Sequence, residues 1–269
     1  MKLAVCSSKG GVGKTSTAAN LAAVLGEQGR TLAVDADPQD SLGRAFAVVA
    51  TDARKSLAGL LGDDPPPIEQ VLRRDVAPGV DVLPAHPALE RVGVALAQEG
   101  GLASSLRRAL RPVAEDYEHI VIDTHGDMGN LTLAAVAAAD AVLTVFTSDP
   151  GSALGAVRLV TFLEQHRRFE NTTAVLLGVA CSNWDKQGAA AREVETALGG
   201  TSLPLFQTKI PFSRRVASAT LAKRPVVLTA PNTAVTAAYR ALTEEVLARY
   251  ATATGSGGDA RRARRRRSA

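Results

Sequence analysis

The sequence predicts an α/β fold in which a doubly wound, mostly parallel sheet carries helices on both faces. Apolar runs of strand length alternate with helix-length amphipathic segments along most of the 269 residues. Most of the strand-like runs are apolar throughout, as expected for parallel strands that are covered on both faces. The first run leads into a glycine-rich loop and a helix, and in such sheets ligands bind where this loop lies, at the carboxyl ends of the strands.

Seven strands are expected, each an apolar run bounded by polar or turn-forming residues. They lie at 2–7, 31–35, 80–84, 119–123, 141–146, 173–180 and near 204–208. Helices are expected in the amphipathic stretches at 15–28, 87–98, 101–115, 129–138, 152–168, 188–198, 212–222 and 233–250. Helices between successive strands give βαβ units. Residues 44–79 are less regular, with a surface turn at Asp63–Pro67 between two short helices.

The composition is that of a globular protein with one sizeable domain. Apolar residues make up 46% of the chain and charged residues 22%, so a core can form without disulfides or metals. Aromatic residues are only 4%, which argues against a base-stacking surface for single-stranded nucleic acid. The two cysteines are too few for an iron–sulfur cluster. We find neither a secretory signal pattern nor an uninterrupted apolar stretch of spanning length, so we expect a cytoplasmic protein without a transmembrane segment.

The positive charge is concentrated at the carboxyl-terminal end. Six arginines lie in the last nine residues: Arg261, Arg262, Arg264, Arg265, Arg266 and Arg267. Without them the net charge of +4 becomes −2, so the rest of the chain is nearly neutral. We therefore expect one domain at 1–251, followed at 252–269 by a disordered glycine/serine linker and an arginine-rich tail.

The segment from Ser8 to Ser16 predicts a phosphate-binding loop. It reads Ser-Lys-Gly-Gly-Val-Gly-Lys-Thr-Ser between a strand and a helix, which is the context that such a loop needs. Glycines let successive backbone N–H groups turn inward around phosphate oxygens, and the following helix directs its positive end there. We expect Lys14 to reach the β- and γ-phosphates and the Thr15 hydroxyl to bind Mg²⁺. The other nucleotide-binding residues predicted in the loop are Gly10, Gly11, Val12, Gly13 and Ser16.

Carboxylates follow two other predicted strands. Asp35 and Asp37 are two residues apart on an extended segment, so their side chains point to the same side and can organise Mg²⁺ or a water. Asp123 ends the apolar strand that begins at His119, as in a Walker B pattern, and is expected to hold Mg²⁺ through water.

The glycine-rich loop departs from the common form, and the departure indicates a family. Ser8 stands where the general pattern has glycine, and Lys9 lies five residues before Lys14. This is the deviant Walker A loop, and the segment resembles the ParA/MinD family of ATPases. The Asp-Ala-Asp-Pro-Gln run at 35–39 resembles the switch I motif of ParA proteins. Further similarity around 209–226 and in the closing helix at 237–247 extends the resemblance over about residues 1–250.

The resemblance implies an ATP- and Mg²⁺-dependent ATPase that forms a sandwich dimer when ATP is bound. Lys9 would then reach across the dimer to the phosphates of the other subunit. Asp37 would position or activate the attacking water, and Asp35 would support metal-bound waters. The implied catalytic residues are thus Lys9, Lys14 and Asp37, and the implied metal residues are Thr15, Asp35 and Asp123. Asn183 would bond the adenine, and the backbone around Pro211 would line its pocket.

The segment after Asp123 differs from the family pattern. The usual prolines of switch II are absent, and the chain reads Thr-His-Gly-Asp, which introduces His125 and Asp127. This segment is expected to sense the γ-phosphate, so the change bears on the hydrolysis rate and on the response to a partner. P-loop enzymes rarely need a general base, and we interpret His125 as a non-catalytic switch residue.

The resemblance leaves three functions open. A ParA-like protein binds DNA without sequence preference and moves plasmids or chromosomes with a ParB-like partner, which would place it on the nucleoid. The DNA-binding residues predicted here are Arg214, Arg215, Lys223 and Arg224, with the arginine tail as a second route. A MinD-like membrane ATPase is the first alternative, although the last helix lacks a large apolar face edged with lysine. A slowly hydrolysing, nucleotide-gated scaffold is the second.

Overall fold

The computed structural model describes residues 1–185, 193–194, 198 and 203–255. Its sheet has seven strands in the order β3-β4-β2-β5-β1-β6-β7, and every neighbouring pair is parallel except β3–β4. The strands are β1 (Lys2–Cys6), β2 (Thr31–Asp35), β3 (Arg73–Ala77), β4 (Val80–Leu83), β5 (His119–Asp123), β6 (Ala141–Phe146) and β7 (Val175–Cys181). The predicted doubly wound α/β class is therefore confirmed.

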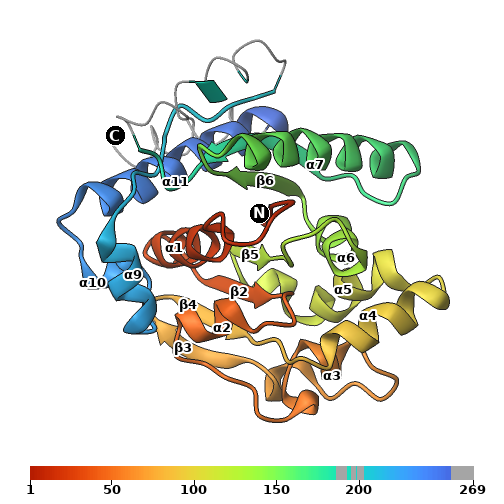
Figure 1. The fold of residues 1–269 in the computed structure, drawn as a ribbon. Coiled ribbons are helices and arrows are strands. Elements are labelled where there is room, and N and C mark those ends of the chain that lie inside the picture. The colour runs from red at the N-terminus through yellow and green to blue at the C-terminus, as the bar shows by residue number, and fades with distance from the viewer. Residues whose placement is uncertain (186–192, 195–197, 199–202, 256–269) are drawn as a thin grey trace, which may run out of the picture.

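Helices cover both faces of this sheet (Figure 1). The α-helices are α1 (Lys14–Gly26), α2 (Ser41–Ala45), α3 (Leu57–Leu60), α4 (Leu89–Gln98), α5 (Leu102–Leu110), α6 (Asn130–Ala138), α7 (Pro150–Arg168), α9 (Arg214–Leu221), α10 (Val226–Thr229) and α11 (Ala234–Ala253). Three 3₁₀ segments lie at Ala53–Lys55, Ile68–Gln70 and Arg111–Asp116.

Successive residues of the central strands pack into different parts of the core. In β1, Leu3 and Val5 belong to the cluster formed with α1 and α11, whereas Ala4 and Cys6 belong to the cluster formed with α7. All four side chains are completely buried. This burial on both faces explains why the strands read as continuous apolar runs.

Three differences from the sequence prediction concern the edges of the sheet and one helix. Strand β3 was not expected, because a short edge strand with three charged residues has no apolar run to reveal it. The segment near 204–208 forms only an isolated bridge between Leu205 and Val179, rather than a strand. The helix expected over 101–115 divides into α5 and a 3₁₀ segment, since Pro112 lacks the N–H that an α-helix would use.

Three further points concern a turn, the residues outside the described ranges and membrane-spanning helices. The turn at Asp63–Pro67 lies between α3 and a 3₁₀ segment, as predicted. Most of the helix expected at 188–198, and the tail from 256 onward, lie outside the described residues. None of the helices in the described part of the chain is long and apolar enough to cross a membrane.

Candidate active site

The carboxyl ends of β1, β2 and β5 meet at one edge of the sheet and form a cleft. Parallel register places Val5 and Asp35 opposite Asp123, so the loops that follow these strands are neighbours. The cleft has a volume of about 650 Å³. Its lining residues are Ser7, Lys9, Gly10, Gly11, Gly13, Lys14, Thr15, Ser16, Asp37, Gln39, Ser41, Arg44, Ala45, His125, Gly126 and Thr220. The predicted loop and Asp37 thus lie together, although more than 20 residues separate them in the sequence.

The glycine-rich loop has the backbone that a phosphate cradle requires. Gly11 and Gly13 have φ angles of 77° and 80°, in the left-handed region that favours glycine. Gly13 also caps α1 without any side-chain bond, which leaves the first N–H groups of that helix directed to the cleft. The hydroxyl of Ser182 donates a hydrogen bond to the carbonyl of Val12 and so fixes this part of the loop.

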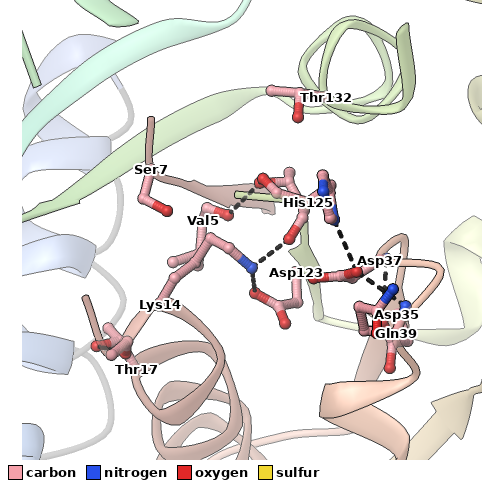
Figure 2. A network of polar contacts seen from close by, with 12 residues as sticks. Val5, Ser7, Lys14, Thr17, Asp35, Asp37, Gln39, Asp123, His125 and Thr132 are labelled. Atoms are coloured by element: carbon pink, nitrogen blue, oxygen red, sulfur yellow. Dashed lines mark hydrogen bonds and ion pairs between the residues drawn. The ribbon is translucent and has the colours of Figure 1, made fainter. Parts of the chain in front are cut away.

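Lys14 makes a buried ion pair at the base of the cleft. Its Nζ donates to Oδ1 of Asp123 at 2.7 Å and also to the carbonyl of Thr124 (Figure 2). The residue is only 6% exposed. Burial alone would lower the pKa of Lys14, but the charge of Asp123, followed by those of Asp37 and Asp35, raises it. Lys14 is therefore a firmly charged ammonium that a phosphate could attract from Asp123.

The carboxylates outnumber the ammonium at this point, which favours a bound cation. Oδ2 of Asp123 is buried and has no hydrogen-bond partner among the described residues. Burial raises the pKa of Asp123, and the charge and hydrogen bond of Lys14 oppose that rise. Burial and then the charge of Asp123 raise the pKa of Asp35 well above its usual value. A divalent cation next to Asp123 and Thr15 would relieve this excess of buried negative charge.

The protein groups by themselves do not make a complete metal site. In the described part of the chain, no three side chains of aspartate, glutamate, histidine or cysteine are grouped so that they could hold a metal ion. This is consistent with Mg²⁺, which is commonly bound by one or two protein oxygens together with phosphates and water.

Asp35 and Asp37 have different surroundings. Both oxygens of Asp35 accept backbone bonds, from the N–H of Asp37 at 3.1 Å and from that of Gly43 at 2.9 Å. Asp35 therefore shapes the loop that carries Asp37. Oδ1 of Asp37 accepts a bond from the N–H of Gln39 at 2.9 Å and lies 2.9 Å from Nδ1 of His125. The sequence singles out His125 without indicating a partner, and the structure supplies Asp37.

Lys9 lies at the rim of the cleft. Its Nζ is 3.5 Å from Oδ1 of Asp149, and its side chain is 57% exposed. Asp149 also caps α7 by accepting a bond from the N–H of Ser152 at 2.8 Å. This hydrogen bond is the main cause that lowers the pKa of Asp149, with the charge of Lys9 contributing. Asp149 was not predicted as a site residue, although it follows β6 and therefore lies at the same edge of the sheet.

The predicted adenine residues lie side by side, next to the glycine-rich loop. The backbone N–H of Trp184 donates to the carbonyl of Ile210 at 2.8 Å, and the backbone N–H of Phe212 donates to the carbonyl of Trp184 at 3.0 Å. This pairing brings Asn183 close to Pro211. Neither Asn183 nor Pro211 lines the cleft itself. Their contact with adenine stays a prediction.

The predicted DNA-binding residues form an exposed basic group around α9. Arg214, Arg215, Lys223 and Arg224 are all exposed, and none makes an ion pair with an acidic residue of the described ranges. Thr220 of the same helix lines the nucleotide cleft. Arg214 and Arg215 therefore begin the helix that borders the cleft, and Lys223 and Arg224 follow its end.

Comparison with known proteins places these features in a family. A family model described as an AAA domain matches residues 1–175. The chromosome-partitioning ATPase Soj of Thermus thermophilus is 35% identical over 250 residues, which cover 92% of this chain and 96% of Soj. The chromosome partitioning protein ParA of Caulobacter vibrioides is 31% identical over 254 residues, with 92% and 94% coverage.

Solved structures agree with this relationship. Apo McdA of Cyanothece superposes with a TM-score of 0.83 at 21% identity, over 91% of this chain and 98% of McdA, and so shares the fold. Cobyrinic acid a,c-diamide synthase of Mycobacterium smegmatis, with an ATP analogue and magnesium bound, superposes with a TM-score of 0.78 at 27% identity. The matched region covers 91% of this chain and 93% of that enzyme. The chain belongs to the ParA/MinD family of P-loop ATPases.

Proposed function

We propose that this protein is a Mg²⁺-dependent ATPase that forms an ATP-sandwich dimer and binds DNA without sequence preference. With a ParB-like partner it drives the partitioning of a plasmid or chromosome. The observation that carries the proposal is the cleft itself, which combines the ammonium of Lys14, the unpartnered Oδ2 of Asp123 and the exposed Lys9 at its rim, all within the described ranges. The similarity to Soj and ParA, both named as chromosome-partitioning proteins, supports the proposed biological use.

The residues of the cleft have separate tasks in this proposal. Backbone N–H groups of the loop and the amino end of α1 bind the phosphates, and Lys14 turns from Asp123 toward them. Thr15 and Asp123 would hold Mg²⁺, and the ion would supply positive charge to stabilise the phosphate oxygens. Asp37 orients the attacking water. Catalysis is then mostly positioning and charge stabilisation.

Dimerisation would use Lys9. In the single chain its ammonium is exposed and lies near Asp149, away from the buried base of the cleft where Lys14 lies. A second copy facing the cleft would present its own phosphates to this side chain. The basic groups around α9 of the two copies would then act together on DNA, so ATP could change DNA affinity without any new residue.

The proposal is tested with two measurements on the wild type and on Asp37→Ala. The wild type should hydrolyse ATP slowly with Mg²⁺ and bind DNA more tightly with ATP than with ADP. Asp37→Ala should lose most turnover, by about 100-fold if water positioning is its main role. It should still bind ATP and DNA, because Asp37 contacts neither the loop nor the basic group in the described chain.

Other outcomes would favour the alternatives. Nucleotide-dependent dimerisation without turnover in the wild type would favour the scaffold. Nucleotide-dependent binding to anionic vesicles, with none to DNA, would favour the membrane ATPase. The geometry gives the latter no anchor at α11, whose apolar side, including Tyr239, Leu242 and Val246, is buried in the core cluster that includes α1.

A further inference from the structure

We propose that His125 is a positioning residue that fixes the carboxylate of Asp37 for ATP hydrolysis. This inference rests on the ATPase function proposed above and assigns a part of it to a residue that departs from the family pattern. Its basis is the contact between Nδ1 of His125 and Oδ1 of Asp37 at 2.9 Å (Figure 2).

The carboxylate of Asp37 is held on one oxygen only. Because a carboxylate accepts, Nδ1 of His125 carries the hydrogen in this bond. The N–H of Gln39 donates to the same Oδ1 at 2.9 Å. Two donors on Oδ1 restrict rotation of the carboxylate, and Oδ2 has no hydrogen-bond partner in the described part of the chain. Asp37 is 7% exposed and lines the cleft, so Oδ2 is left for a water.

The backbone that carries His125 is itself fixed against the phosphate loop. The hydroxyl of Thr124 donates to the carbonyl of Val5 at 3.1 Å, which ties the segment to β1. A Cβ added to Gly126 would lie 3.1 Å from the nitrogen of Gly10, so the two backbones are nearly in contact. The segment of His125 therefore lies against the glycine-rich loop by its backbone and contacts Asp37, 88 residues away in the sequence, by its imidazole.

His125 also borders a second hollow. His125 and Gln39 line both the nucleotide cleft and a neighbouring cavity of about 260 Å³ between α4 and the segments around Pro38 and Asp127. Replacing the ring by a methyl group would leave more room for water beside Asp37. The carboxylate would then lose a donor and gain solvent, and both changes reduce its order.

Three variants of His125 separate positioning from a purely structural role. His125→Ala removes the donor. His125→Asn keeps an N–H at the same distance along the side chain as Nδ1, whereas His125→Gln places it one atom further, at the reach of Nε2. We expect kcat of His125→Ala to fall about tenfold or more, as for loss of one hydrogen bond to a charged group. KM and ADP affinity should stay within about twofold, because the loop contacts are backbone bonds. His125→Asn should recover most of kcat, and His125→Gln should not.

The outcomes distinguish this inference from the function on which it rests. An unchanged or raised kcat in His125→Ala, or equal kcat values for the asparagine and glutamine variants, overturns the role of His125 while the ATPase function stands. If His125→Ala fails to fold, the comparison of His125→Asn with His125→Gln decides alone. Absence of turnover in the wild type overturns the ATPase function and, with it, any role for His125 in hydrolysis.

Discussion

At the scale of single residues, the cleft gathers buried acidic groups with few protein partners. Asp35 and Asp123 are completely buried, and Lys14 is the buried ammonium that pairs with Asp123. Asp40, on the same loop as Asp37, is 3% exposed, and its buried Oδ1 has no hydrogen-bond partner among the described residues. Buried charge of this kind lowers the stability of the folded chain, which is expected where a site is built for a cation and phosphates rather than for stability.

Asp40 gives a testable pH dependence. Burial raises its pKa from 3.8 to about 6, and the charge of Arg44 opposes this. Between about pH 4 and pH 6, Asp40 is protonated in the folded chain but ionised in the unfolded chain. Asp40 therefore lowers the free energy of unfolding as the pH rises through this range. Asp40→Asn should stabilise the protein by about 1–2 kcal/mol at pH 7.5, and the gain should vanish near pH 4. Urea unfolding across this pH range measures it.

Asparagine suits the position, because Asp40 has a φ of 55° and asparagine tolerates left-handed backbone. Asp63→Asn is the matched control, since Asp63 is exposed and the same substitution there removes no buried charge. A gain that is the same at pH 4 and pH 7.5 would exclude burial of the Asp40 charge as its cause.

At the scale of elements, the turn between β3 and β4 packs closely against the end of α1, and each segment has a glycine at the contact. Gly79 lies in the turn between β3 and β4 with a φ of 67°. A Cβ there would be 2.1 Å from the carbonyl oxygen of Gly26, the last residue of α1. The carbonyl of Gly79 also accepts a bond from the N–H of Thr31 at 2.9 Å, at the start of β2. The turn thus positions the strand that leads to Asp35 and Asp37.

Gly79→Ala should destabilise the protein much more than Gly100→Ala. Both glycines have left-handed backbone, with φ of 67° and 74°, so alanine costs about 1–2 kcal/mol at either one. Only at Gly79 does the added methyl meet backbone, whereas nothing lies within 4 Å of it at Gly100. The total for Gly79→Ala should reach about 3 kcal/mol or more. Equal losses in urea unfolding would show that the turn can move away from α1.

At the scale of the whole molecule, the chain separates its tasks across the sheet. The cleft lies at the carboxyl edge of the sheet, and α1 and α11 pack in the core on one face. The exposed basic residues flank α9, whose Thr220 lines the cleft. Arg240 on α11 donates from Nη1 and Nη2 to the two carboxylate oxygens of Glu27 at the end of α1, at 2.5 and 2.8 Å. This bidentate contact joins α11 to the phosphate-binding helix.

The basic group around α9 should carry ATP-dependent DNA binding, if the proposed function holds. Replacing its four cations by alanine should weaken binding to DNA with ATP. It should also flatten the salt dependence, by up to about 0.9 in log–log slope for each DNA phosphate that the variant no longer neutralises. A chain truncated after Gly255 should still bind DNA more tightly with ATP than with ADP. It should lose only the part of the DNA affinity that is the same with either nucleotide. Fluorescence anisotropy on random-sequence duplex DNA, with ATP or ADP, measures both.

A second set of four exposed arginines serves as the control: Arg91, Arg108, Arg167 and Arg168. Their replacement changes the net charge equally and leaves α9 intact. If both sets weaken DNA binding alike, net charge rather than the α9 surface attracts DNA. If only the shortened chain loses binding, the arginine tail is the DNA-binding element.

The fold class and most of the residues that line the cleft could be predicted from the sequence. A glycine loop between a strand and a helix predicts a phosphate site in a parallel sheet, and the rule that strand ends meet placed Asp35, Asp37 and Asp123 beside Lys14. These signals are local or follow from the order of elements, so no packing detail was needed. The edge strand β3 escaped because its pattern carries no periodicity of its own.

Which side chains of separate loops are in contact could not be predicted from the sequence. The pairing of His125 with Asp37 and that of Lys9 with Asp149 join segments 88 and 140 residues apart. Such contacts depend on how the loops pack against one another. The sequence periodicity of a segment reports only its own secondary structure, so it does not predict which other segment it contacts. For the same reason the sequence could name His125 as unusual, while its role had to come from the position of its ring.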